Sequence, residues 1–199
     1  MVKLSKAIFA LFHTNTCPVC DCKLLAEECI CLHCLYSLPR TKNHDQANNS
    51  AEKILAGRFP FERVATFLNF NKDGMLRPII HELKYKNNKA VGYKIGKLFG
   101  EDLLGSNFIE TIDLIVPIPL HHKKLKARGY NQSEIIAQGI SQTTSIPVSS
   151  NNLVREIHNP SQTKLSKTQR WENVDGIFKL VNPNLYSNKH IMLIEDIKT

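Results

Sequence analysis

The sequence predicts an α/β protein in which helices flank a sheet, preceded by a small zinc-finger module with four cysteine ligands. Short apolar runs alternate with segments of helical periodicity, which favours a parallel or mixed sheet. The last apolar run, "IMLIED", ends in two acidic residues. All six cysteines of the 199-residue chain lie between residues 17 and 34, which marks a separate module at the amino end.

Composition indicates a globular protein with an anionic partner. Hydrophobic residues make up 42% of the chain and charged residues 22%. The formal net charge of +8 suggests a phosphorylated metabolite or a nucleic acid as ligand. The segment up to Thr16 lacks a long apolar core and a cleavage site, so it predicts a short packing helix. No run approaches the roughly 20 apolar residues that cross a bilayer, so we expect a cytoplasmic protein without membrane insertion.

Two Cys-x-x-Cys pairs predict the metal site. The four expected ligands are Cys17, Cys20, Cys31 and Cys34. Each pair forms a tight turn that directs both sulfurs to one point, and two such turns build a tetrahedral zinc site with no open position. Disulfides are the alternative, but they need an oxidising compartment that nothing in the sequence suggests.

The remaining cysteines leave other ligand sets open. Cys22 and Cys29 belong to the spacings Cys20-x-Cys22 and Cys29-x-Cys31, and we expect them to be spare thiols beside the site. His33 and His44 lie nearby in the sequence and could replace a cysteine, although surface positions are the commoner explanation. Zinc binding would fold this segment, which has too little apolar surface to hold itself together.

Elements after the module follow from periodicity and turn signals. A polar stretch, "KNHDQANNSAEK", separates a module of residues 1–50 from a sheet domain of residues 59–199. The expected strands lie within residues 63–70, 113–120, 149–156, 176–181 and 190–196. The expected helices cover residues 74–86, 90–105 and 131–143, with a helical turn at 165–173.

A basic loop precedes one of these helices. The segment "HHKKLKARGYNQSE" places Lys124 and Arg128 before a helix that starts near Asn131. The free N–H groups and positive dipole end of a helix suit a phosphate or a nucleic-acid backbone. A solvated basic loop without a ligand is the alternative.

A long polar stretch, "REIHNPSQTKLSKTQRWEN", is compatible with a lid or with a disordered connector. As a lid, it would carry Arg155, Gln162 and Arg170 over an anionic substrate and exclude water.

The acidic pair closes the last strand. Glu195 and Asp196 follow an apolar run that reads as a buried strand, and ligands of open α/β sheets bind at the carboxyl ends of strands. A solvated strand terminus is the alternative.

The order of these motifs resembles the ComF family of phosphoribosyltransferase-like competence proteins. The resemblance spans nearly the whole chain: the paired cysteines, then "HELKYK", then "VPIPLHHKKLKARGYNQSE", and finally "IMLIED". It implies an amino-terminal zinc finger followed by a type I phosphoribosyltransferase-like sheet flanked by helices. It also implies phosphoribosyl pyrophosphate (PRPP) as ligand, with Mg²⁺ bridging its pyrophosphate and ribose oxygens.

Site residues follow from the resemblance. Glu195 and Asp196 match the acidic pair that accepts hydrogen bonds from the ribose hydroxyls. Thr199 matches the first residue of the phosphate loop, and Lys124, Arg128, Asn131 and Gln132 are expected to contact PRPP or another phosphate. The family's loop continues past the position of Thr199, so the resemblance predicts either a fragment of a longer chain or a chain that has lost its phosphate site. In both cases the chain as it stands is expected to be inactive as a transferase.

Two functions therefore compete. The first is a ComF-like protein that binds PRPP or a related phosphoribosyl ligand and takes part in DNA uptake. The second is a non-catalytic zinc-containing accessory protein that binds single-stranded DNA beside the competence helicase machinery. The positive charge supports the second function, whose affinity would fall steeply with added salt.

Overall fold

The computed structural model describes residues 15–25, 27–157 and 176–196. The chain packs as two compact units, Met1–Val91 and Gly92–Thr199, and each is described by itself. The module boundary expected between residues 50 and 59 stays a prediction. The expected amino-terminal helix and the helical turn at 165–173 lie outside the described residues. Within the described ranges, no helix combines the length and hydropathy that a membrane span requires.

The first unit is built from short helices joined by turns. It contains α2 (Leu32–Tyr36), the 3-10 turn η1 (Asn43–Asp45), α3 (Ser50–Leu55) and α4 (Leu76–Tyr85). The helix expected over residues 74–86 is confirmed by α4. Its apolar residues Leu76, Ile79 and Leu83 recur at a spacing of three to four and are buried, as one face of an amphipathic helix requires.

The strand expected over residues 63–70 is wrong. This segment is irregular and has only an isolated antiparallel bridge, between Leu68 and Arg40. Side chains take the backbone groups that a neighbouring strand would bind: Val64 N–H donates to Glu52 Oε1 at 3.1 Å, and Thr66 N–H donates to Asn43 Oδ1 at 2.9 Å. Backbone pairing is confined to the bridge, where Thr41 N–H donates to Phe67 and Asn69 N–H donates to Pro39.

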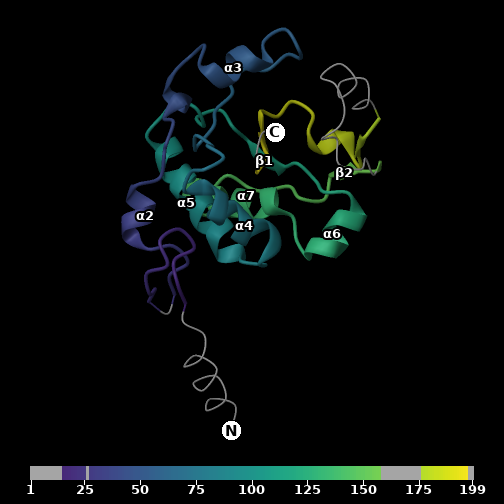
Figure 1. Ribbon diagram of the computed structural model, residues 1–199. Helices are drawn as coiled ribbons and strands as arrows, with labels where there is room; N and C mark the ends of the chain where they lie inside the picture. The colour runs from purple at the N-terminus through teal and green to yellow at the C-terminus, as the bar shows by residue number, and fades with distance from the viewer. Residues whose placement is uncertain (1–14, 26, 158–175, 197–199) are drawn as a thin grey trace. The chain divides into compact units, whose positions relative to one another are not determined.

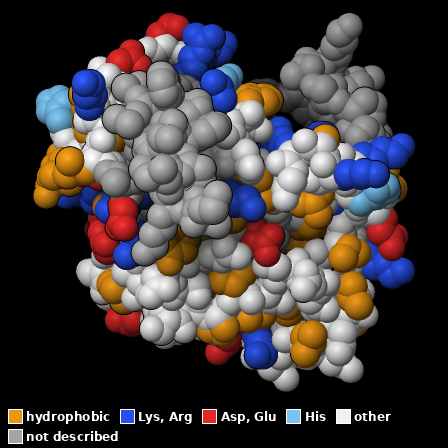
Figure 2. Space-filling view, turned by 90° about the horizontal axis from the view of Figure 1, so that it is seen from below, with side chains coloured by type: hydrophobic (Ala, Val, Ile, Leu, Met, Phe, Trp, Pro, Cys, Tyr) orange, Lys and Arg blue, Asp and Glu red, His pale blue; other side chains and the backbone are white. Residues whose placement is uncertain are grey.

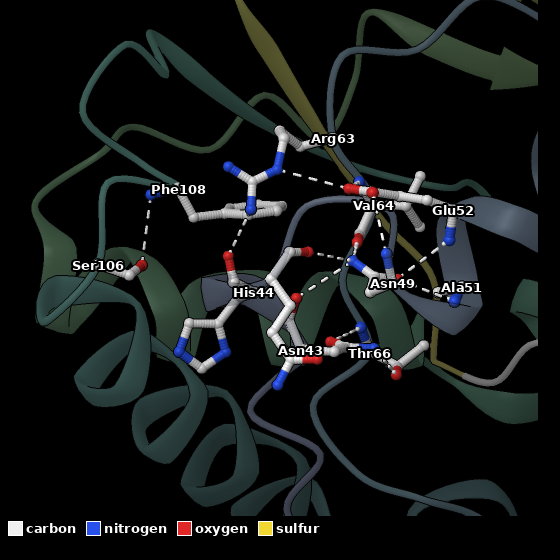
Figure 3. A network of polar contacts seen from close by, with 11 residues as sticks. Asn43, His44, Asn49, Ala51, Glu52, Arg63, Val64, Thr66, Ser106 and Phe108 are labelled. Carbon is white, nitrogen blue, oxygen red and sulfur yellow. Dashed lines mark hydrogen bonds and ion pairs between the residues drawn. The ribbon is translucent and has the colours of Figure 1, made fainter.

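A buried polar network organises this part of the first unit (Figure 3). Asn49 caps α3, because its Oδ1 accepts from the N–H groups of Ala51 and Glu52, and Glu52 Oε2 accepts from Asn49 N–H. This is a capping box, which satisfies the orphan donors of a helix start. The Asn49 amide also donates to the carbonyl of Val64 at 2.7 Å. The network thus ties α3 to the irregular segment in place of a sheet.

The second unit contains a small parallel sheet. Strand β1 (Leu114–Pro117) pairs in parallel with β4 (Ile191–Ile194), in the register Leu114 with Ile191 and Pro117 with Ile194 (Figure 1). All four residues of β1 are buried. On its other side β1 makes a parallel bridge from Ile115 to Val148. The strands expected within 113–120 and 190–196 are confirmed, with β1 at the centre.

Burial along β4 differs from the prediction. The run was expected to be a buried strand. Met192 and Ile194 are buried, whereas Leu193 is 59% exposed. Alternate residues of a strand point to opposite faces of the sheet. Within the described residues, therefore, one face of β4 packs against the core and the other reaches solvent.

Two helices of the second unit pack closely through glycines. Helix α5 (Lys89–Leu104) and helix α7 (Gln132–Thr144) confirm the helices expected over 90–105 and 131–143. A Cβ atom on Gly96 would overlap the carbonyl oxygen of Ile136, and one on Gly139 would overlap that of Tyr93. The close approach buries Ile136, Ala137 and Ile140 of α7, which packs on β1 and β4.

A two-stranded antiparallel sheet completes the second unit. Strand β2 (Leu153–Arg155) pairs with β3 (Phe178–Leu180), as the expected strands within 149–156 and 176–181 predicted. The short 3-10 turn η3 (Pro183–Leu185) follows.

The basic segment was expected to be a loop, and this expectation is wrong: it forms helix α6 (His122–Arg128). His121 caps the helix through Nδ1, which accepts from the N–H of Lys123. Gly129 ends it in the left-handed conformation at φ 80°, which glycine adopts without steric cost.

Candidate functional site

The first candidate site is a cluster of thiols in the first unit. The Sγ atoms of four cysteines lie within 4.8 Å of one another: Cys17, Cys20, Cys22 and Cys31. Cys20 Sγ and Cys31 Sγ are 3.7 Å apart. Two thiolates that bind one tetrahedral zinc at about 2.3 Å lie about 3.8 Å apart, so this spacing fits zinc. The cluster can hold a structural metal ion.

Local backbone structure builds this cluster. The N–H of Cys17 donates to the carbonyl of Cys22 at 2.8 Å, and the N–H of Asp21 donates to Cys17 at 2.9 Å, which closes a tight turn. Asp21 adopts the left-handed conformation at φ 58° that the turn needs. Across the cluster, Cys31 is the N-cap of α2. The Cys34 N–H donates to Cys31 Sγ at 3.5 Å, and such a donor stabilises a thiolate.

Proton sharing among the thiols follows from these contacts. The backbone N–H of Cys34 and the neighbouring thiols lower the pKa of Cys31 to about 6. Hydrogen bonds with Cys20 and Cys31 raise the pKa of Cys22 to about 12. The Cys31 thiol therefore ionises at a lower pH than the Cys22 thiol. A metal ion that binds all of them as thiolates must release protons.

Four sulfurs gather in the structure, and Cys34 stays a predicted ligand beside them. Cys17, Cys20 and Cys31 come together as expected, but Cys22, expected to be a spare thiol, completes the group. Cys34 is buried beside it, where burial and then the thiols of its neighbours raise its pKa. The signal for Cys22 was present in the spacing Cys20-x-Cys22. The choice between Cys22 and Cys34 as fourth ligand depends on sulfur positions that spacing does not fix.

The second candidate site lies at the carboxyl edge of β1 and β4 in the second unit. Because the strands are parallel, both end at the same edge: the N–H of Ile118, just after β1, donates to the carbonyl of Ile194 at 2.9 Å. Glu195 and Asp196 follow Ile194 directly. Glu195 is exposed and Asp196 is half-buried. The acidic pair therefore stands at the position where open α/β sheets bind ligands.

The start of α7 reaches the same edge. Asn131 is the N-cap of α7, where its Oδ1 accepts from Ser133 N–H, while its Nδ2 donates to the carbonyl of Ile118 at 3.0 Å. The N–H of Ile118 thus bonds to Ile194, and the carbonyl of Ile118 bonds to the side chain of Asn131. The chain of bonds ties the helix start, with its positive dipole end, to the strand that carries the acidic pair.

Arg128 and Gln132 form a hydrogen bond near the start of α7. Arg128 at the end of α6 donates from Nη1 to Oε1 of Gln132 at 2.8 Å. Gln132 is only 1% exposed, and its Nε2 has no acceptor within hydrogen-bond distance among the described residues. Burial raises the pKa of Tyr130, while the Gln132 amide and the Arg128 charge partly offset that rise. Tyr130 was not among the predicted site residues, since the burial of a single tyrosine has no sequence signal of its own.

The remaining predicted residues are placed as follows. Lys124 lies half-buried in α6. Arg155 of the expected lid lies in strand β2, with its guanidinium 5.7 Å from the centre of the Phe178 ring. Gln162, Arg170 and Thr199 lie outside the described residues. The lid and the phosphate loop stay predictions.

The fold and the sites define a mixed α/β protein whose amino-terminal cysteine cluster can hold a metal ion. The chain is 25% identical over 199 residues to the DNA utilization protein YhgH of Escherichia coli (strain K12), covering 98% of this chain and 83% of that protein. It is 23% identical, with the same coverage, to the YhgH protein of Salmonella typhimurium. It is 28% identical over 126 residues to the Competence protein F of Haemophilus influenzae, covering 61% of this chain and 55% of that protein.

These homologues agree with the resemblance to the ComF family. No family model matches the chain, and no solved structure matches it.

Proposed function

We propose that this protein binds PRPP or a related phosphoribosyl ligand at the carboxyl edge of β1 and β4, and takes part in DNA uptake or handling. One observation carries the ligand proposal: the bonds through Ile118 bring the acidic pair after β4 and the start of α7 to one edge. The names of the homologues, Competence protein F and DNA utilization protein, support the DNA-related role.

The chemistry of this edge suits a phosphorylated sugar. Glu195 and Asp196 provide carboxylate oxygens, which accept hydrogen bonds from adjacent ribose hydroxyls. Asn131, Gln132 and Arg128 supply donors and positive charge for phosphate oxygens at the helix start. Mg²⁺ bound with the ligand would neutralise pyrophosphate charge, and the same carboxylates are ligands that it accepts. The buried Gln132 amide is a donor that a phosphate could satisfy.

Calorimetric titration of the purified protein with PRPP and Mg²⁺ tests the ligand proposal. We expect binding in the wild type and its loss in the double variant Glu195→Ala, Asp196→Ala. The matched control is Glu101→Ala, Glu110→Ala, which removes the same charge from exposed positions of the same unit. Equal affinity in the wild type and the acidic-pair variant would refute the assignment.

A second candidate function, binding of single-stranded DNA without catalysis, is favoured by helix α6. Its seven residues carry four cations, Lys123, Lys124, Lys126 and Arg128, and no acid. Fluorescence anisotropy with a labelled oligonucleotide should show affinity that falls steeply as salt rises, because phosphate contacts release counterions. Replacing Lys123 and Lys126 with glutamine should reduce that slope. An affinity independent of salt would contradict this function.

A further inference from the structure

The outward face of helix α4 carries three side chains in a row. Arg77, His81 and Tyr85 are spaced four residues apart and are exposed, opposite the buried face of the helix. Residues four apart lie on one face, with a rise of about 6 Å between successive members. We call this row the α4 stripe. It takes no part in either candidate site.

Two rings of the α4 stripe form an exposed aromatic pair. The ring centres of His81 and Tyr85 are 5.2 Å apart at an interplanar angle of 46°. Tyr85 is 69% exposed. Among the residues of α4, all of which the structure describes, no other large hydrophobic side chain is exposed. The stripe therefore presents ring faces without the aliphatic anchors that a hydrophobic protein groove or a membrane surface would engage.

The segment that contains α4 is rich in basic residues. From Lys72 to Lys89 the chain carries five lysines and arginines against two acids, Asp73 and Glu82. One carboxylate oxygen of Glu82 accepts from the amide of Asn88 at 3.2 Å. The net charge of this segment is positive. Elsewhere the surface is mixed: basic, acidic and hydrophobic side chains intermingle on the face of the molecule drawn in Figure 2. Charge complementarity points to a polyanion.

The stripe continues into a hollow at the start of α4. Arg77 lines this open cavity of about 420 Å³ together with Val19 of the cysteine turn, Pro78 and residues 73–75. A guanidinium beside an open hollow can contact a phosphate. The row thus offers a cation, a hollow and two rings within one unit of the protein.

We propose that the α4 stripe binds single-stranded nucleic acid, with bases stacked on Tyr85 and His81 and phosphates beside Arg77, Lys84 and Lys86. Stacking on aromatic rings combined with a basic path is the usual chemistry of single-strand recognition, because every base has a ring face to offer. Duplex DNA does not fit this chemistry, since its bases are already stacked. The inference rests on the proposed DNA-related function and names a contact surface for it on α4, in addition to the basic residues of α6.

The experiment compares two probes of equal length and charge: a labelled oligothymidylate and the same backbone without bases. For the wild-type protein we expect tighter binding of the oligothymidylate. Tyr85→Ala should weaken oligothymidylate binding about tenfold, because it removes one stacking partner, and should leave binding of the abasic probe unchanged. Tyr85→Phe keeps the ring and should retain the wild-type affinity. Tyr36→Ala is the matched control, since Tyr36 is an 85% exposed tyrosine of the same unit.

The possible outcomes distinguish failure of the α4 inference from failure of the DNA-related function. If Tyr85→Ala binds both probes as the wild type does, the α4 stripe is not the binding surface, while the DNA-related function stands. The variant of α6 with glutamine at Lys123 and Lys126 then tests whether the contact lies there. An equal loss in Tyr36→Ala would also overturn the inference, because the effect would not be specific to α4. Absence of binding to any single strand would overturn both the inference and the DNA-related function, but not PRPP binding, which the calorimetry measures separately.

Discussion

Each of the two units of this protein is stabilised internally by a different kind of interaction. In the first unit, thiols and buried polar side chains organise short helices and an irregular chain, with Asn43, Asn49 and Glu52 all buried. In the second unit, apolar strands and closely packed helices form the core around Ile115 and Ile140. A region with little regular structure depends on specific bonds, whereas a sheet with helices depends on apolar burial. The comparison predicts different responses to metal removal, to added volume and to pH.

Loss of the metal should produce the largest difference between the stabilities of the two units. In Cys31→Ser we expect loss of bound zinc and unfolding of residues 15–40, since structural zinc contributes on the order of 10 kcal/mol to such modules. Zinc content by emission spectrometry and amide hydrogen exchange measure this, and exchange in β1 should stay unchanged. Cys29→Ser, outside the four-sulfur group, is the control and should retain zinc. A Cys31→Ser protein with wild-type zinc affinity would contradict the site.

Added volume should harm the second unit. Gly139→Ala places a methyl group against the backbone of α5, including Lys97 N at 2.8 Å, so the helices must move apart. We expect a loss of about 2–3 kcal/mol in the free energy of unfolding, measured by urea denaturation. The control is Gly105→Ala, where the nearest atom lies at an ordinary 3.7 Å. Equal stability of the two variants would show that α5 and α7 do not pack through glycine.

Acid should weaken the polar network of the first unit. Burial alone would raise the pKa of Glu52, but N–H donors of Val64 and Asn49, with the charge of Arg63, lower it below its ordinary value of 4.5. A lowered folded pKa stabilises the protein above the ordinary pKa, and this stabilisation is lost as the pH falls through the folded value. Glu52→Gln should cost about 1–2 kcal/mol at pH 7, because an amide offers one acceptor fewer.

Urea midpoints measured from pH 7 to pH 3 check this dependence. The difference between wild type and Glu52→Gln should shrink on acidification, and Glu101→Gln at an exposed position of α5 should show no such difference at any pH. A difference that stays constant down to pH 3 would mean that the ionised carboxylate does not support the network.

The smallest effect belongs to an exposed ion pair of the second unit. Lys179 Nζ lies 3.3 Å from Glu156 Oε1, with side chains 64% and 52% exposed. Lys179→Ala should change the unfolding free energy by less than about 0.5 kcal/mol, because solvent screens the pair. A loss above about 1 kcal/mol in urea denaturation would show that charge pairs, and not only apolar burial, hold this unit.

Local signals explain which predictions were confirmed. The apolar runs ending at Pro117 and Ile194 form parallel strands. Helix α4 lies within its predicted range, and α5 and α7 each extend one residue beyond theirs. Periodicity over ten or more residues identifies a helix without knowledge of its neighbours. The strand predicted from the alternation over residues 63–70 is wrong, because a strand needs a partner strand. Here side chains of Glu52 and Asn43 accept the N–H groups of Val64 and Thr66 instead.

The sequence by itself determined the cysteine cluster, the strand that precedes Glu195 and Asp196, and the helix that Asn131 caps, because each depends on spacing within a few residues. Only the tertiary structure decided that Cys22 joins Cys17, Cys20 and Cys31, and that Asn131 and Ile194 both bond to Ile118. Those pairings join residues far apart in the chain or depend on side-chain directions. Packing fixes both, and no local pattern encodes them.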